Sequence, residues 1–196
     1  MSRFVIEIKI SVKDRQQVLE KLQKMGFQKK TEIIEEDMYF NSDHYDIKKR
    51  DEALRIRKST YIAENRTTAQ INFKGPKIDK ISMSRIEYET DIKDAKSMEN
   101  ILQALGFQPV AGVEKVRCYL ERDGMAACVD CVKGLGDFLE LEVLTEEEGQ
   151  REKNLRKMDK VLEELGYSIK DTVRSSYLSM LMQERDDGKM IDICLC

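Results

Sequence analysis

The chain has little of what the common catalytic and nucleotide-binding motifs require. Its 196 residues contain one histidine and two prolines, and no apolar run approaches the roughly 18–20 residues that a membrane-spanning helix needs. His44 has no Ser/His/Asp set to join, and the chain has no glycine-rich phosphate loop. The 34 basic residues are balanced by 37 acidic ones, so the chain lacks the basic excess of nucleic-acid-binding proteins. We therefore expect neither a membrane protein nor a nucleic-acid partner.

The cysteines and the start of the chain bear on its compartment. Cys128 and Cys131 have the spacing of half a zinc site, but no second pair stands at metal-ligand spacing. Reduced cysteines in a cytosolic protein are the more common explanation. Residues 1–3 lead into a strand-like segment rather than a secretory signal. The sequence therefore predicts a cytoplasmic protein.

Apolar spacing and capping residues predict helices and strands in alternation. Asp14 and Asp94 can cap two amphipathic helices that end at Gly26 and Gly106. A third helix carries apolar residues from 155 to 165, and a short one is expected within 171–185. No Pro/Gly-rich linker divides the chain, so we expect one domain over residues 1–185 and a loose tail over 186–196. The predicted strands lie near residues 3–12, 32–40, 53–60, 67–74, 83–92, 111–121, 125–132 and 137–144.

The two capped helices belong to an internal repeat. A shift of 80 residues places Glu7 on Glu87 and residues 26–28 (Gly-Phe-Gln) on 106–108. Two units that merely share generic helix-stop chemistry would also match in this way. A duplicated half-barrel is the second interpretation, and both stay open at this point.

Charged residues occupy every second position of most strand-like segments. In residues 4–10, Glu7 and Lys9 alternate with four apolar residues, so the charges share one face of a strand. A single such strand usually turns its charged face to water, and an open sheet with helices on one side would also give this pattern. Repeated over many strands, the pattern favours an α+β fold: an eight-stranded antiparallel closed β-barrel, or tunnel, with helices packed outside.

A charged barrel interior would need partners for both signs of charge. An anionic ligand that carries cations supplies them, because Arg and Lys bind phosphate oxygens and carboxylates bind hard metals. Triphosphate with Mg²⁺ or Mn²⁺ is such a ligand. The predicted interior cations are Lys9, Arg55, Arg57, Lys74, Arg85, Lys115 and Arg117, and the predicted interior anions are Glu7, Glu87, Glu89, Asp130, Glu140 and Glu142.

An ordered set of motifs resembles a known family. From about residue 3 to about residue 182 the chain is similar to the CYTH superfamily of triphosphate tunnel metalloenzymes, and within it to the class IV adenylyl cyclases. The segment Arg174-Ser175-Ser176-Tyr177-Leu178 also resembles the end of that branch. The other motifs are Ile6-Glu7-Ile8-Lys9, Asp37-Met38-Tyr39-Phe40, Leu54-Arg55-Ile56-Arg57-Lys58, Phe73-Lys74-Gly75-Pro76, Arg85-Ile86-Glu87-Tyr88-Glu89, Lys115-Val116-Arg117, Val129-Asp130 and residues 134–142.

The resemblance implies roles for the predicted interior residues. The cations would bind the phosphates of a nucleoside triphosphate or of inorganic triphosphate, with Lys9, Lys74 and Arg117 as the catalytic candidates. Mg²⁺ or Mn²⁺ would be held by Glu7, Glu140 and Glu142, and Glu87, Glu89 and Asp130 are further acidic candidates. The implied reaction of the cyclase branch converts ATP to cyclic AMP and pyrophosphate, whereas hydrolase relatives cleave thiamine triphosphate or inorganic triphosphate. A homodimer is compatible with the resemblance.

One position departs from the family pattern. The opening motif Glu-x-Glu-x-Lys reads here Val5-x-Glu7-x-Lys9, so the first carboxylate is missing. One anionic ligand fewer should weaken a metal site. A non-catalytic module that binds a triphosphate is therefore a third hypothesis beside the cyclase and the triphosphatase.

Overall fold

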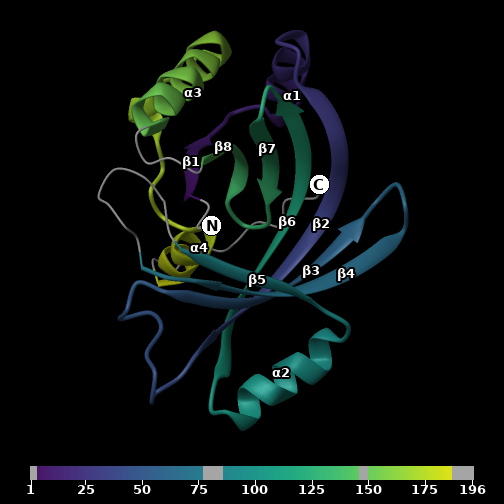
Figure 1. Cartoon of the computed structure of the whole chain (residues 1–196), viewed down its shortest axis with the longest axis vertical. Helices are drawn as coiled ribbons and strands as arrows, with labels where there is room; N and C mark the ends of the chain where they lie inside the picture. Colours follow the sequence, from purple (N-terminus) through teal and green to yellow (C-terminus); the bar gives the residue numbers. More distant parts are fainter. Residues whose placement is uncertain (1–3, 77–85, 146–149, 187–196) are drawn as a thin grey trace.

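The computed structural model describes residues 4–76, 86–145 and 150–186. Across these residues the chain forms one eight-stranded antiparallel sheet that curves around a concave side, with helices at both ends of its convex side (Figure 1). The strands are β1 (Phe4–Ser11), β2 (Gln28–Asn41), β3 (Ala53–Tyr61), β4 (Arg66–Lys74), β5 (Glu87–Ile92), β6 (Gln108–Arg122), β7 (Met125–Val132) and β8 (Gly136–Thr145). The helices are α1 (Arg15–Lys24), α2 (Ala95–Ala104), α3 (Arg151–Leu165), the short 3-10 helix η2 (Ile169–Asp171) and α4 (Tyr177–Asp186).

The predicted capping residues delimit α1 and α2. The Asp14 carboxylate accepts a hydrogen bond from the Gln17 backbone N–H at 3.0 Å, and Asp94 caps α2 in the same way. Gly106 follows α2 with φ of +88°, a conformation that favours glycine. These local signals explain why both helices begin and end where the sequence predicts.

The strand order agrees with the internal repeat. The order β1-β8-β7-β6-β2-β3-β4-β5 places β2 and β6 together at the centre, and each is followed outward by the hairpin strands of its own half. Glu35 of β2 pairs with Lys115 of β6, and these two positions are 80 residues apart. The two central strands therefore meet at a pair of positions that are related by the 80-residue shift, which is the arrangement that two similar halves would give.

The prediction of a closed barrel is wrong for the described residues, because β1 and β5 end the sheet and do not pair with each other. The C-terminal segment occupies the edge of β1 instead. The Val173 backbone N–H donates to the Lys9 carbonyl oxygen at 2.7 Å, and Thr172 forms a β-bridge with Ile10. β5 is also short, with six residues, so it offers little edge for closure. The antiparallel α+β architecture itself is confirmed.

Two apolar cores lie on the convex side. The larger core packs β1, β6, β7 and β8 against α1 and α3 at one end of the molecule, with Ile10, Leu22 and Leu162 fully buried. The smaller core packs β3 and β4 against α2 at the other end (Figure 1). Helices thus cover the apolar faces of the strands, and the charged faces are left to line the concave side.

Most predicted elements lie within a few residues of those observed. The loop predicted at 75–82 and the start of the strand predicted at 83–92 fall on residues 77–85, which lie outside the described residues, as does the tail from 187 to 196. The prediction of reduced cysteines is wrong for Cys131, which is disulfide-bonded, whereas Cys118 and Cys128 are free thiols. Within the described ranges, no helix has both the length and the apolar character to cross a membrane.

Candidate functional site

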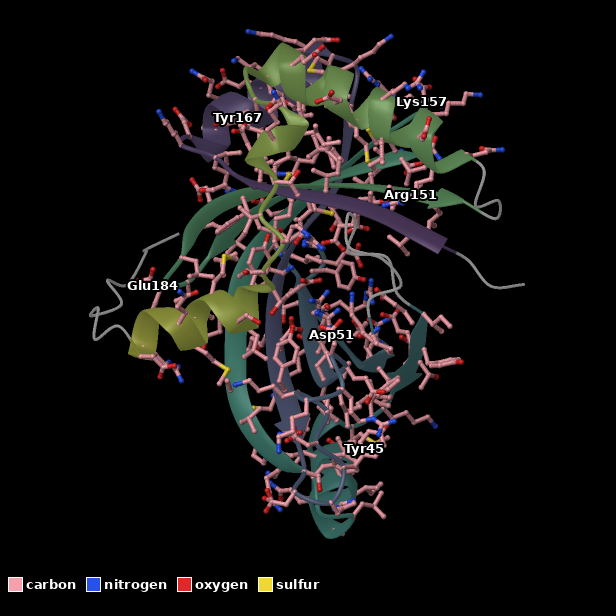
Figure 2. All side chains as sticks on the ribbon, turned by 90° about the vertical axis from the view of Figure 1, so that its left-hand side faces the viewer. Tyr45, Asp51, Arg151, Lys157, Tyr167 and Glu184 are labelled. Carbon is pink, nitrogen blue, oxygen red and sulfur yellow. The ribbon has the colours of Figure 1, made fainter. Side chains whose placement is uncertain are left out.

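A cavity of about 710 Å³ opens on the concave side of the sheet. Its wall combines strands from both halves of the chain with the loop 42–52 and the start of α4. In Figure 2 the label of Asp51, a residue of that loop which lines the cavity, lies near the middle of the molecule, between α2 and α3. The predicted site residues that line this cavity are Glu7, Lys9, Arg55, Arg57, Lys74, Glu87, Lys115, Arg117, Glu140 and Glu142.

Two carboxylates of this wall lie opposite each other and form no ion pair with any described residue. Glu7 of β1 is in register with Glu142 of β8, and neither has a described cation within ion-pair distance. Burial, reinforced by Glu140 and Glu142, raises the pKa of Glu7 to about 7. Burial also raises the pKa of Glu142, which Arg117 only partly offsets. The pair therefore resists full ionisation unless a cation joins it.

Lys9 is a buried cation of the same cavity wall, on the same strand as Glu7. Its ammonium lies 3.8 Å from Glu140 Oε1 and 4.4 Å from the centre of the Tyr177 ring. Only 2% of Lys9 is exposed, yet its Nζ makes no hydrogen bond within 3.5 Å to any described residue. This ammonium therefore keeps donors for a ligand in the cavity.

Asp130 is the centre of a buried ion network rather than a part of the cavity wall. It is completely buried, and Arg117 donates to both its oxygens, from Nε at 2.7 Å and from NH2 at 2.6 Å. Lys115 Nζ and the Tyr177 hydroxyl both donate to Asp130 Oδ2, at 3.2 and 3.0 Å. Burial alone would raise the pKa of Asp130, but Arg117 and Lys115 outweigh it and hold the pKa well below its usual value. The carboxylate orients two cations of the wall.

Arg117 also contacts the cavity carboxylate Glu140 through a short hydrogen bond from its NH2 group. Burial would raise the pKa of Glu140, but Arg117 and Lys115 lower it overall. Glu140 is therefore ionised and already shared between Lys9 and Arg117, unlike Glu7 and Glu142.

Two acidic residues of β2 hold the arginines of β3. Arg57 binds Asp37 through Nε at 2.6 Å and NH2 at 2.8 Å, and it binds Glu35 through NH1 at 2.7 Å. Arg55 NH1 donates to Asp37 at 3.2 Å, while its buried Nε has no hydrogen-bond partner among the described residues. Arg55 and Arg57 outweigh the burial of Asp37 and lower its pKa. An unsatisfied guanidinium N–H beside the cavity fits an anionic ligand.

The β4–β5 hairpin supplies the remaining predicted residues. Lys74 Nζ donates to Glu87 Oε1 at 2.8 Å, and both residues line the cavity. Glu89 is exposed and accepts a hydrogen bond from Asn72 at 3.3 Å, so it lies along the same strand but not in the cavity wall. Arg85 lies outside the described residues.

The site also uses residues that the charge pattern does not identify. Glu35 and Asp37 are buried ion-pair partners, and Tyr177 reaches the network from α4. Asp37 and Tyr177 do occur in the family motifs, but Glu35 carries no comparable signal because the adjacent Glu36 is charged too. The cavity also includes Arg174, whose side chain has no ion pair with any residue of the described ranges.

One part of the cavity wall is apolar. Leu178 and Met182 contribute it from α4, and Phe40, Ile47 and Leu54 contribute it from the end of β2, the following loop and β3. A volume of about 710 Å³ lies within the usual range for sites that enclose a whole small molecule, about 300–1,000 Å³. The wall thus offers cations for an anionic group and apolar surface for an attached organic group.

The side chains of the cavity wall include carboxylates of the type that bind divalent cations. Within the described ranges, however, no group of three His, Cys, Asp or Glu side chains is arranged so that it could hold a metal ion by itself. The oxygens of Glu7 and Glu142, which have no ion pair within the described part of the chain, are hard anionic ligands of the kind that Mg²⁺ and Mn²⁺ take. Mg²⁺ commonly binds through one or two carboxylates together with substrate phosphates. The two carboxylates opposite each other match that pattern.

Comparison with known proteins agrees with this geometry. Residues 3–177 match the CYTH domain family. A Methanocaldococcus jannaschii protein with the name "Putative adenylate cyclase" is 38% identical over 175 residues, which cover 89% of this chain and 97% of that protein. The solved structure of the PH1819 protein from Pyrococcus horikoshii is 33% identical, with a TM-score of 0.83, and the match covers 92% of this chain and 99% of that one.

A more distant structure has the same fold. A Hippeastrum protein with the name "Putative adenylyl cyclase", for which a dominant triphosphatase activity is described, is 18% identical with a TM-score of 0.64, and the match covers 96% of this chain and 97% of that one. The family match covers most of the chain, and the Methanocaldococcus relative is similar along nearly its whole length. This chain therefore belongs to the CYTH domain family.

Proposed function

We propose that this protein binds ATP with a divalent cation in the concave cavity and converts it to cyclic AMP and pyrophosphate. The observation that carries the proposal is the convergence on one cavity of many cations and of two carboxylates, Glu7 and Glu142, without ion pairs to described residues. The name of the Methanocaldococcus relative favours the cyclase among triphosphate reactions. The apolar part of the wall gives the nucleoside a surface to pack against.

The cations would bind the triphosphate. Lys9 and Arg55 have N–H donors without a partner among the described residues, and Arg57, Lys74, Lys115 and Arg117 have more N–H groups than their described carboxylate partners occupy. Charge-assisted hydrogen bonds to phosphate oxygens are stronger than neutral ones. Lys9, Lys74 and Arg117 are the proposed catalytic cations, because they would stabilise negative charge that develops on the reacting phosphoryl groups.

The carboxylates would hold Mg²⁺ or Mn²⁺. Glu7 and Glu142 are the proposed primary ligands, with Glu140 beside them and Glu87 at the β5 side of the cavity. When bound, the metal neutralises phosphate charge and polarises phosphoryl oxygens. Asp130 and Glu89 are less suited to this role, because Asp130 is saturated by its own partners and Glu89 lies off the cavity wall.

The proposed reaction is an intramolecular displacement at the α-phosphorus. The ribose 3′ oxygen forms a new bond to this phosphorus, and its hydroxyl proton passes to solvent water. The bond from the α-phosphorus to the oxygen that bridges to the β-phosphate breaks, and pyrophosphate leaves with the electron pair. The residues of this chain contribute by holding the triphosphate in line and by stabilising the charge on pyrophosphate.

Hydrolysis is the second candidate. Water would attack the terminal phosphoryl group of thiamine triphosphate or inorganic triphosphate in the same cavity, with the same cations. The triphosphatase activity ascribed to the Hippeastrum protein supports this alternative. A non-catalytic triphosphate-binding module is the third, supported by Val5, which lines the cavity where the family pattern has a carboxylate.

Product analysis separates the three. The protein is incubated separately with ATP, thiamine triphosphate and inorganic triphosphate, each with either Mg²⁺ or Mn²⁺, and nucleotides, thiamine phosphates, pyrophosphate and phosphate are resolved by chromatography. The cyclase predicts cyclic AMP and pyrophosphate in equal amounts. Phosphate without cyclic AMP would favour the hydrolase over the cyclase. Binding without any product would favour the non-catalytic binding module.

A further inference from the structure

Tyr177, the first residue of α4, connects groups of the cavity that come from separate strands. Its hydroxyl donates to Asp130, and its ring faces the ammonium groups of Lys9 and Lys115 at 4.4 and 5.2 Å. We propose that Tyr177 is a positioning residue, whose ring holds these two ammonium groups in place for the phosphates of the substrate. The inference rests on the proposed triphosphate site and assigns it a specific support.

The case is clearest for Lys9. An ammonium at normal ion-pair distance would lie closer to Glu140 than the observed 3.8 Å. The electron-rich face of the Tyr177 ring, whose centre is 4.4 Å from Nζ, also attracts the ammonium. Because an aromatic face attracts an ammonium less strongly than a carboxylate does, the ring stabilises Lys9 while its N–H donors stay available to a phosphate oxygen.

Lys115 is held in a related way. It binds Glu35 at 3.1 Å and Asp130 at 3.2 Å, and the ring covers a further side of its ammonium. The Tyr177 hydroxyl donates to Asp130 Oδ2, the same oxygen that Lys115 contacts. Burial, together with Glu140 and Asp130, raises the pKa of Tyr177, so the phenol remains a neutral donor.

The ring itself is fixed from several directions. Phe138 packs edge-on against it, with ring centres 5.0 Å apart, and only 8% of Tyr177 is exposed. Val173, four residues earlier, donates its backbone N–H to the carbonyl oxygen of Lys9 at 2.7 Å. The C-terminal segment thus fixes both the backbone and the ammonium of Lys9, so a change at Tyr177 should be felt at that cation.

Loss of the ring should weaken triphosphate binding. Without the aromatic face, the Lys9 ammonium can move to Glu140 and form an ordinary ion pair, which withdraws its donors from the ligand. Tyr177→Leu should therefore bind inorganic tripolyphosphate at least tenfold more weakly. Tyr177→Phe keeps the ring and should stay within about threefold of the parent. Both affinities are measured by titration calorimetry with the full chain.

A change of ring electronics separates positioning from packing. Tyr177→pentafluorophenylalanine keeps the shape of phenylalanine but reverses the charge distribution of the ring face, which then repels a cation. It should bind tripolyphosphate at least fivefold more weakly than Tyr177→Phe, with a similar melting temperature. This comparison remains decisive even where Tyr177→Leu does not fold.

Two further variants localise the effect. Tyr61 also stacks on a cation, Arg66 at 4.1 Å, but lies outside the cavity wall, so Tyr61→Leu should bind as the parent does. In a Lys9→Met background, exchange of the phenylalanine for its fluorinated form should change affinity less than it does when Lys9 is present, because only Lys115 then still faces the ring. Equal affinities of the phenylalanine and pentafluorophenylalanine proteins would overturn the inference, whereas a parent protein that binds no tripolyphosphate would instead contradict the proposed function.

Discussion

Glu7 and Glu142 are directly opposite partners in the β1–β8 register, and both line the cavity. Like charges at such positions destabilise an antiparallel pair. Burial, Glu140 and Glu142 raise the pKa of Glu7 to about 7, well above the usual range of a glutamic acid. The fold therefore keeps an unfavourable pair in the place where the proposed substrate brings a metal ion, and this relationship can be tested without any assay of activity.

The first prediction concerns stability and pH. The pKa of Glu7 is about 7 in the folded protein and about 4.5 in the unfolded chain. The folded state therefore binds the proton more tightly, and this group costs stability as pH rises from about 4.5 to 7. Glu7→Gln should leave the metal-free protein nearly unchanged at pH 5 and stabilise it at pH 8 by up to about 3 kcal/mol. Urea unfolding at both pH values measures the difference.

Added Mg²⁺ provides a second reading of the same variant. If Glu7 binds the metal, Mg²⁺ should stabilise the parent more than it stabilises Glu7→Gln. The difference in unfolding free energy between the two proteins at pH 8 should then become smaller or change sign. Glu163→Gln, at an exposed position of α3, is the control and should show neither effect. If Glu7→Gln is no more stable than the parent at pH 8, Glu7 and Glu142 do not destabilise the folded protein as proposed.

The second prediction separates function from stability at Glu142. This carboxylate has no ion pair with a described cation, so its removal leaves no buried charge without a partner. Glu142→Ala should fold as the parent does, yet require at least tenfold more Mg²⁺ for half-maximal turnover. Glu121→Ala, on the exposed end of β6, should behave as the parent does. Unchanged turnover at limiting Mg²⁺ would remove Glu142 from the metal site.

The third prediction concerns Arg57, where binding and stability are linked. Its guanidinium binds both Asp37 and Glu35, so Arg57→Ala leaves two buried carboxylates short of a partner. Loss of one partner of a buried pair typically costs about 3–5 kcal/mol, which is the expected loss of stability. Triphosphate binding should weaken by about 1.5–3 kcal/mol if Arg57 also makes one charge-assisted bond to the ligand.

A second substitution distinguishes the two effects. Asp37→Asn in the Arg57→Ala background removes one unpaired charge and should recover part of the stability without recovering triphosphate binding. Lys58→Ala, at the exposed neighbouring position, should alter neither. If the double variant recovers affinity as well, Arg57 acts only by holding Asp37.

The charge pattern predicted one side of the site well, because side-chain alternation along a strand is local. Lys115 and Arg117 of β6, and Glu140 and Glu142 of β8, all face the cavity as their two-residue spacing predicts. Glu35 was missed because Glu36 beside it is also charged, so alternation alone does not say which of the two faces inward.

The remaining features depend on contacts between distant parts of the chain. Asp130 was predicted as an inward-facing anion, but its saturation by Arg117, Lys115 and Tyr177 follows from the register of β6 with β7 and from the docking of α4, 47 residues away. Closure of the sheet is equally non-local. The sequence predicted strands able to close, while the edge of β1 pairs instead with the segment around Thr172.

The last prediction restores the carboxylate that the family pattern leads one to expect at Val5. This residue shares the cavity face of β1 with Glu7 and Lys9. Val5→Glu would add a third anion near two that already resist ionisation, so the metal-free protein should lose stability at pH 8. With an additional oxygen ligand available, Mg²⁺ or Mn²⁺ should bind on the order of tenfold more tightly, since ligand charge sets the affinity of such sites.

Val5→Gln matches the size of the glutamate without its charge and should leave metal affinity near that of the parent. Calorimetric titration of all three proteins with Mn²⁺ decides the matter. Equal affinity of the glutamate and glutamine variants would mean that position 5 does not reach the metal, and that Val5 does not explain any weakness of the site.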